Sequence, residues 1–272
     1  MAEFLVIRLG SRPEKSAHWI AVDANGTRRS PVVTGPLAEA TKDVGDKQVI
    51  VLVPAESVLT TSVDLPIKSS ARLRSALPFA LEEQLAEDVE NLHFAAGRRG
   101  DKGLMQVAVV SHSQMQDWLA TLQAAGIAAA QVVPENHGLA RIPGTMSLLI
   151  ADGHVMFNDG AETEFVMQDV KPSEAIAVTG ALDADESPGH LLVYCEPADE
   201  ANFEHDWNVL RHELASVDIN LLPDGALPRL AVTIAAGRGV NLLQGSYGPK
   251  VEYGPMLKPW RTAAALLLAL LM

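Results

Sequence analysis

The amino-acid sequence predicts an α/β protein with mixed sheets, built as two lobes with a small α+β subdomain inserted between them. The order strand, strand, strand, helix, strand is expected in residues 4–53 and again in residues 146–195. The two copies share negligible sequence identity, so only the order of elements repeats. A helix-and-strand segment separates them. The 272 residues suffice for one large core or two modest ones.

Composition and charge exclude several functional classes. Hydrophobic residues make up 48% and charged residues 20% of the chain, as in a folded globular protein. The net charge of −13, with no run of Lys or Arg, argues against a nucleic-acid partner, because phosphate neutralisation needs clustered cations. The single cysteine, Cys195, excludes an internal disulfide and a Cys-based zinc site, which fits a reducing compartment. The N-terminus lacks the features of a secretory signal.

The first copy is predicted from apolar runs and turn residues. Strands are expected at residues 4–9, 18–23, 28–34 and 48–53, and an extra alternating strand at residues 58–65. Asn25-Gly26 favours a tight turn, because both residues tolerate positive φ. Leu37 and Val44 belong to a short helix that Gly45 ends.

The middle segment predicts the inserted subdomain. Its first helix has an apolar stripe with a spacing of four, made of Leu73, Leu77, Leu81 and Leu85. Pro78 lies inside this helix and should kink or restart it. A strand is expected at residues 104–110. The capping-box pattern of residues 113–116 predicts the start of a second helix, and residues 129–133 predict a last short strand.

The second copy is followed by an amphipathic helix. Strands are expected at residues 146–151, 154–157, 163–167 and 190–195, a turn at Asp152-Gly153, and a helix at residues 173–182. The amphipathic helix has one apolar face, formed by Phe203, Trp207, Leu210, Leu214 and Val217. Residues 223–259 are rich in Pro and Gly and predict a linker.

The C-terminal residues predict the start of a membrane helix. No charge interrupts Ala263 to Met272, and Lys258, Trp260 and Arg261 before this run are typical of a cytoplasmic membrane edge. Ten helical residues extend about 15 Å, half of a bilayer core of about 30 Å. We therefore expect a chain cut inside a transmembrane segment. The alternative is a terminal helix buried in the protein's own core, but the run is apolar on every side.

The sequence contains no pattern for a metal centre or a hydrolase. No two of the eight histidines have the spacing of a helical zinc site. Gly245-Ser246-Tyr247-Gly248 departs from the Gly-x-Ser-x-Gly pattern and lies in the expected linker. Neither a catalytic residue nor a metal ligand is expected.

Two βββαβ lobes are the arrangement of the actin and sugar-kinase group, in which the first hairpin of each lobe supplies Asp and Gly to phosphates and metal. Here the first hairpin, Leu9-Gly10-Ser11-Arg12-Pro13, has no carboxylate, and the second, at Asp152-Gly153, has no glycine-rich loop. Backbone N–H groups need Gly to approach phosphate closely, and Mg²⁺ needs oxygen ligands. The sequence therefore predicts an actin-like, ribonuclease H-like fold without catalysis and without a cofactor.

The most unusual charge pattern lies in the middle segment. Five acids fall within nine residues with no base among them: Glu82, Glu83, Glu87, Asp88 and Glu90. The cationic pair Arg72 and Arg74 precedes them on the same expected helical stretch. Such a pattern belongs either to a solvated helix face or to a charged docking surface, where complementarity sets partner choice and encounter rate. We take these seven residues as the predicted partner-binding site.

Several sequence motifs occur together in the middle segment, and their combination is specific to one family. They are Leu65-Pro66, then Arg74-x-Ala76-Leu77-Pro78-Phe79-x-Leu81-Glu82-Glu83, then Glu87-Asp88-x-Glu90-x-Leu92-His93-Phe94. With these motifs, essentially the whole chain resembles the cytoplasmic part of protein L of bacterial type II secretion. Asn241-Leu242-Leu243-Gln244-Gly245 with Tyr247 is similar to the juxtamembrane signature of that family.

The resemblance implies a single-pass protein of the bacterial inner membrane, of which this portion is cytoplasmic and actin-like. It implies an adaptor without enzymatic activity, which holds the cytoplasmic secretion ATPase, protein E, at the inner-membrane platform. It also implies pairing with protein M and with a second copy as a homodimer, and it points to protein F and the pseudopilins as further partners.

The expected parts are a first lobe (1–66), an inserted α+β subdomain (67–134), a second lobe (135–240), a juxtamembrane linker (241–262) and the truncated start of a transmembrane helix (263–272). Two other functions stay open. One is an actin-like tether of type IV pili, with similar lobes around a similar insert; the apolar tail and the poor phosphate hairpins count against it. The other is an active actin-like ATPase or sugar kinase, against which the hairpins also count.

Overall fold

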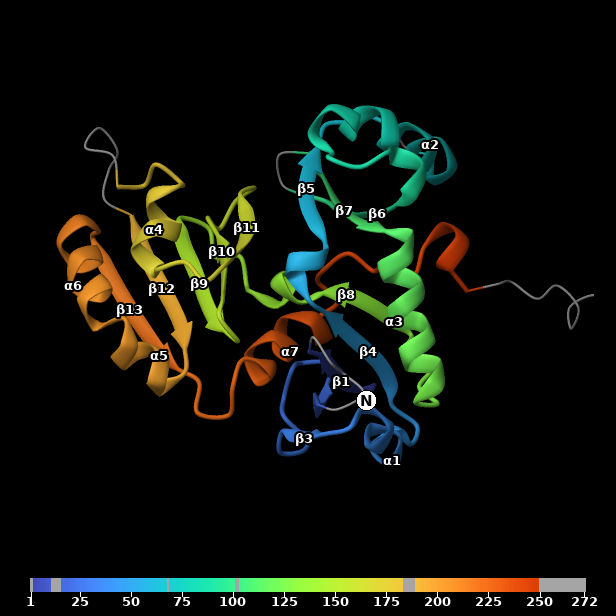
Figure 1. Ribbon diagram of the computed structural model, residues 1–272, viewed down its shortest axis with the longest axis horizontal. Helices are drawn as coiled ribbons and strands as arrows, with labels where there is room; N and C mark the ends of the chain where they lie inside the picture. Colours follow the sequence, from blue (N-terminus) through green and yellow to red (C-terminus); the bar gives the residue numbers. More distant parts are fainter. Residues whose placement is uncertain (1, 11–15, 68, 101–102, 183–188, 250–272) are drawn as a thin grey trace, which may run out of the picture. The chain divides into compact units, whose positions relative to one another are not determined.

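The computed structural model describes residues 2–10, 16–67, 69–100, 103–182 and 189–249 (Figure 1). The chain divides into two compact units, residues 1–242 and residues 243–272. The described part of the second unit contains one short 3-10 helix, η6 (Gly245–Tyr247). The three sheets lie in the first unit.

A five-stranded mixed sheet forms the first lobe, in the order β3-β2-β1-β4-β8. Its strands are β1 (Glu3–Leu9), β2 (Ala17–Asp23), β3 (Val33–Gly35), β4 (Gln48–Val53) and β8 (Gln131–Pro134). β2 runs antiparallel to β1, whereas β4 runs parallel to it. η1 (Leu37–Ala40) and α1 (Thr41–Val44) connect β3 to β4, and Gly45 ends α1 with a φ of 49°.

A second five-stranded sheet repeats this topology in the order β11-β10-β9-β12-β13. Its strands are β9 (Thr145–Ala151), β10 (His154–Asn158), β11 (Glu164–Gln168), β12 (His190–Cys195) and β13 (Ser216–Leu221). α4 (Pro172–Ala177), α5 (Pro197–Asn202) and α6 (Glu204–Glu213) lie beside it (Figure 1). The turn at Asp152-Gly153 has φ of 51° and 77°, the values of a type I′ hairpin. The repeated order confirms the predicted mixed α/β fold.

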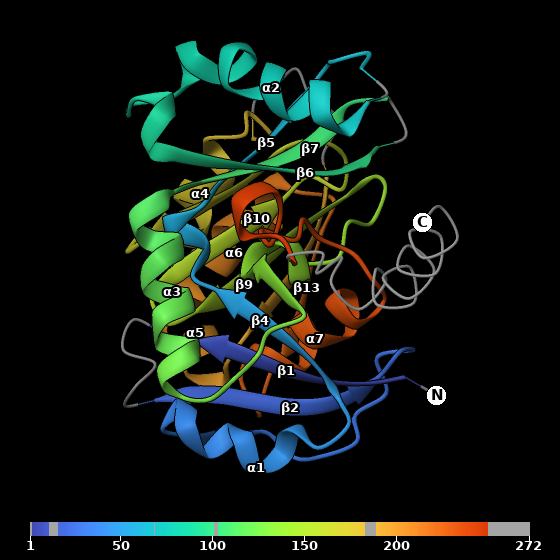
Figure 2. The same cartoon turned by 90° about the vertical axis from the view of Figure 1, so that its right-hand side faces the viewer.

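A three-stranded antiparallel sheet, β5-β7-β6, carries the insert. Its elements are η2 (Ala55–Ser57), β5 (Leu59–Val63), α2 (Ser70–Leu81), η3 (Glu82–Gln84), η4 (Val89–Asn91), β6 (Leu92–Arg99), β7 (Met105–Ser111) and α3 (His112–Ala124). α2 lies across one face of this sheet, where Leu73, Leu77 and Leu81 pack with Phe94 and Val107 (Figure 2). Pro78 lies within α2 without dividing it, and the helix ends three residues later.

Sheet pairing differs from the sequence prediction at both ends of the insert. Residues 129–133 were expected to close the insert, but β8 pairs with β4 and completes the first sheet. The extra strand expected in the first lobe, β5, pairs with β7 of the insert. β6 was not predicted. The cap of α3 is Ser111, whose hydroxyl accepts from the Gln114 N–H at 3.2 Å, and not a residue in 113–116. The predicted boundaries of the domains themselves stay predictions.

The amphipathic helix and the linker were also predicted wrongly in part. The helix ends at Glu213, and Val217 lies on β13, parallel to β12. Residues 223–259 were expected to be a linker, yet α7 (Leu227–Ala235) belongs to the core. Its apolar residues pack with β1, β2 and β4 of the first sheet and with β9 and β10 of the second. A short helix starting with Leu-Pro therefore joins both lobes in one core cluster.

The segment after α7 also contributes to the first unit. Leu242 is fully buried, and its N–H donates to the Val132 carbonyl at 2.7 Å. The Asn241 side chain accepts from the Val132 N–H, and His93 Nε2 donates to the Leu242 carbonyl at 2.7 Å. Asn241 and Leu242 therefore cover the free edge of β8 through Val132.

The described ranges contain no helix that combines the length and apolar character needed to cross a bilayer. The predicted membrane edge, Lys258, Trp260 and Arg261, and the apolar run at residues 263–272 lie outside the described residues.

Candidate functional site

A pocket of about 400 Å³ opens where the first hairpins of the two lobes meet the ends of β4 and β8. In an actin-like fold these hairpins are the ones that contact phosphate. Its lining consists of Arg8, Leu9, Gly10, Ser16, His18, Pro54, Glu56, Glu135, Asp152 and His154. The parallel strands β4 and β8 end on the same side of the sheet, which brings Glu56 and Glu135 to one rim. Residues 11–13 of the first hairpin lie outside the described residues.

Arg8 dominates this pocket. Its Nε donates to Glu135 Oε2 at 2.5 Å, and its Nη1 donates to Asp152 Oδ2 at 2.6 Å. The side chains of Arg8 and Glu135 are only 11% and 4% exposed, whereas that of Asp152 is 70% exposed. Burial opposes the charge on Arg8, but the two carboxylates outweigh it and raise its pKa. Arg8 is therefore a permanent cation whose charge is already compensated.

The remaining charges make the pocket unfavourable for a triphosphate. Among the described residues that line the pocket, Glu56, Glu135 and Asp152 are acidic, and Arg8 is the one Lys or Arg. Burial and the neighbouring Arg8 lower the pKa of His18, which therefore adds no positive charge near neutral pH. A phosphate group would meet repulsion from these three carboxylates. Within the described ranges, no three His, Cys, Asp or Glu side chains are grouped to hold a metal ion.

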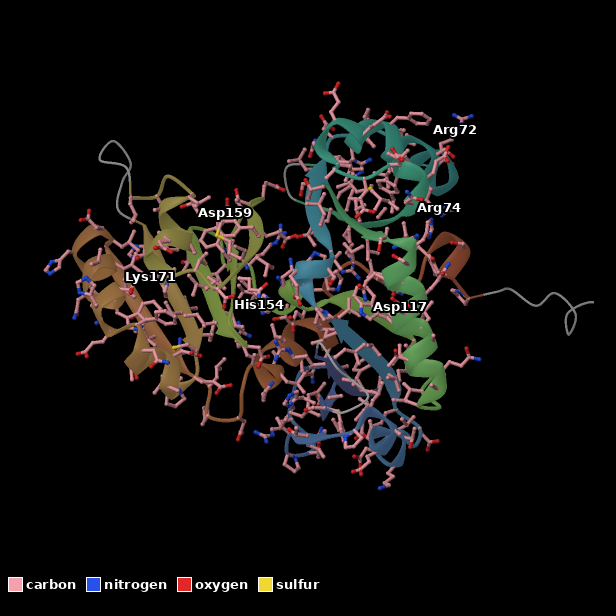
Figure 3. All side chains as sticks on the ribbon, viewed as in Figure 1. Arg72, Arg74, Asp117, His154, Asp159 and Lys171 are labelled. Carbon is pink, nitrogen blue, oxygen red and sulfur yellow. The ribbon has the colours of Figure 1, made fainter. Side chains whose placement is uncertain are left out.

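The predicted partner-binding residues lie on the surface of the insert. Arg72 and Arg74 are exposed on α2 (Figure 3). The five acids are also exposed, but they occupy η3, η4 and the loop between them. They do not continue the α2 helix, so the prediction of one helical stretch was wrong. Among the described residues, none of these seven side chains forms an ion pair, which leaves their charges open to solvent.

The structure adds one apolar residue to this surface. Phe79 is 79% exposed, the largest value among the exposed large hydrophobic residues of the described chain. It lies two positions from both Leu77 and Leu81, which places it opposite the buried stripe of α2. A bulky aromatic on the polar face of an amphipathic helix was a signal that the sequence already contained. A groove of about 440 Å³ lies beside the acidic loop, lined in part by Leu59, Leu85 and Glu87.

Known proteins resemble the chain over nearly its whole length. The model of the family "Type II secretion system (T2SS), protein L" matches residues 5–250. Protein L of Pectobacterium carotovorum is 28% identical over 271 residues, which cover 94% of this chain and 59% of that protein. Protein L of Dickeya chrysanthemi is 32% identical over 149 residues, or 53% of this chain and 37% of that protein. The chain thus spans about three fifths or less of these relatives.

Solved structures show the same fold. The cytoplasmic domain of EpsL, an inner-membrane component of the type II secretion system of Vibrio cholerae, superimposes with a TM-score of 0.64 at 21% identity, covering 90% of this chain and all of that one. A Bacteroides thetaiotaomicron protein with an actin-like ATPase fold has a TM-score of 0.51 at 11% identity and covers 85% of this chain and 95% of that one. The actin-like fold is therefore shared, and the chain belongs to the protein L family of the type II secretion system.

Proposed function

We propose that this chain is the part of a non-catalytic adaptor that recruits the secretion ATPase, protein E, to the inner-membrane platform and links it to protein M. The observation that carries this proposal is the contrast between two charged regions. In the interlobe pocket the charges of Arg8, Glu135 and Asp152 compensate one another. On the insert, seven charged side chains and Phe79 face solvent.

The physical role is local concentration. A domain tethered to a membrane raises the effective concentration of its partner there, so modest affinity suffices. Membership of the protein L family supports a single-pass inner-membrane location, with this portion on the cytoplasmic side. It also supports a homodimer of this chain, with protein F and the pseudopilins as further partners. These assignments belong to the proposal.

Charge reversal on the insert tests the docking surface. A variant with Glu82→Lys, Glu83→Lys, Glu87→Lys and Asp88→Lys should lose most of its co-purification with the N-terminal domain of the ATPase. The matched control reverses four exposed acids on other elements, Glu3, Asp46, Asp117 and Glu213, and changes the net charge equally. Equal capture of the ATPase domain by both folded variants would contradict this site.

The enzymatic alternative has its own test. Equilibrium dialysis with ATP and Mg²⁺ should show no binding at micromolar concentrations, because three carboxylates line the interlobe pocket. Micromolar binding that Arg8→Met abolishes would favour an active actin-like ATPase instead.

A further inference from the structure

A second pocket, of about 170 Å³, has the opposite charge to the interlobe pocket. Four arginines line it: Arg98, Arg99, Arg141 and Arg238. Its lining contains no Asp or Glu, although the chain as a whole has 34 acidic residues against 21 basic ones. The arginines come from β6, from the segment before β9 and from the segment after α7. The fold therefore gathers cations that are far apart in sequence.

Only one of these four cations has a carboxylate partner among the described residues. Arg141 Nη2 lies 2.8 Å from Glu164 Oε2, so this charge is compensated. Arg99 donates to the backbone carbonyls of Leu65, Ile67 and Gly103, which fix its guanidinium without neutralising it. Arg98 and Arg238 are exposed and form no ion pair within the described part of the chain. As far as the described residues show, three of the four arginines around this concave surface therefore lack a compensating carboxylate.

His137 and Gly239 form part of the pocket wall. His137 is buried, and its Nδ1 accepts from the Val240 N–H at 3.2 Å, so its Nε2 carries the proton that faces Glu164. Gly239 has a φ of 103°, and a Cβ at this position would lie 2.7 Å from Val133 Cγ1. The backbone at residue 239 therefore requires glycine, and no side chain from this position fills the pocket.

We propose that this pocket binds an oxyanion of the phosphate class, with Arg98, Arg99 and Arg238 as its cationic ligands. Guanidinium groups bind phosphate through paired N–H donors and stay charged at every physiological pH. Clefts lined by charge of one sign concentrate the oppositely charged ligand. The volume is below the range of sites for whole cofactors, so it suits a phosphate or diphosphate group and not a complete nucleotide. The site is separate from both the interlobe pocket and the acidic surface of the insert.

Isothermal titration calorimetry of the chain with pyrophosphate at low salt tests this site. Saturable binding of one equivalent is expected, and Arg98→Gln with Arg238→Gln should weaken it about tenfold or more. The control, Lys42→Gln with Arg211→Gln, removes two exposed positive charges from other elements and should leave binding unchanged. Higher salt should weaken wild-type binding, because it screens exposed charges.

A parallel arm separates two sources of the anion. Vesicles with phosphatidylglycerol and vesicles of phosphatidylcholine are compared for sedimentation of the same variants. Binding to the anionic vesicles that is lost in the Arg98 and Arg238 variant would assign the group to a lipid headgroup, and binding to pyrophosphate alone would assign it to a soluble phosphate. Absence of saturable pyrophosphate binding, or equal loss in the Lys42 and Arg211 control, would overturn the proposal.

Discussion

Removing the Arg8 side chain should destabilise the first lobe far more than removing its exposed partner. Arg8→Met keeps the length of the side chain but leaves Glu135, which is 4% exposed, without its cation. Removing one partner of a buried ion pair costs about 3–5 kcal/mol, since the other charge stays desolvated. Asp152→Asn should cost less than about 1 kcal/mol, because this carboxylate is 70% exposed and its contact is solvent-screened.

Asp152→Asn removes the charge without straining the backbone. Asp152 has a φ of 51°, and Asn tolerates this left-handed region as well as Asp does. Arg8→Met combined with Glu135→Met should recover much of the stability, because two apolar side chains replace two charges. Urea unfolding midpoints of these three variants and of the unmodified chain measure these differences. If Asp152→Asn cost as much as Arg8→Met, the assignment of the stabilisation to the buried pair would be refuted.

Three further predictions concern other buried contacts. Burial raises the pKa of Glu164, but the hydrogen bond from His137 and the charge and hydrogen bond of Arg141 outweigh it and lower the pKa to about 2. Because its pKa is lowered, the Glu164 carboxylate stabilises the folded state at pH values above its unfolded pKa of about 4.3. Glu164→Gln should therefore reduce the free energy of unfolding by about 3 kcal/mol at pH 7 and by little near pH 2, as measured by urea unfolding. Burial, with Asp199 and Glu200, raises the pKa of Cys195 to about 11, so alkylation at pH 8 should be slow until urea unfolds the chain. Gly138→Ala places a Cβ 2.8 Å from Leu230 Cβ and should cost about 1–3 kcal/mol in the same unfolding assay, because Leu230 is packed in the buried core.

The sequence predicted the elements that have strong local signals. The strand expected at residues 190–195 has the same bounds as β12, and the turn at Asp152-Gly153 has the geometry that its residues favour. Both follow from local chemistry, namely a continuous apolar run and residues that tolerate positive φ. The repeat gave four strands and one helix of each lobe, but not the fifth strand of either sheet, β8 or β13.

The sequence could not predict which sheet a short strand joins. β8 is apolar and short, and its pairing with β4 depends on a return of the chain after the insert. α7 was not predicted as a helix, because Pro and Gly residues surround it in the sequence. Leu227, Leu230 and Ile234 nevertheless have helical spacing. Its partners are residues such as Val6 and Met156, which no local pattern connects to it. Long-range burial, not propensity, decides both cases.

The candidate site was only partly accessible from sequence. Exposure of the acidic stretch could be predicted from its composition, but its division into two 3-10 turns could not. Arg8 carried no signal, because an Arg inside a run of apolar residues can face either solvent or a pocket. Its role depends on Glu135 and Asp152, which are 127 and 144 residues away in the chain.

These three charged regions differ in how much of their charge is already compensated. Arg8 meets two carboxylates within 2.6 Å and therefore stabilises the fold, with little charge left for a ligand. The acids of the insert have no ion-pair partners among the described residues, so a cationic partner would be needed to neutralise their charge. In the arginine pocket, three cations have no carboxylate partner among the described residues, and an anion would complement them. Compensation within the chain therefore separates structural charges from recognition charges, and the variants above test each class by a different readout: unfolding, protein capture and anion binding.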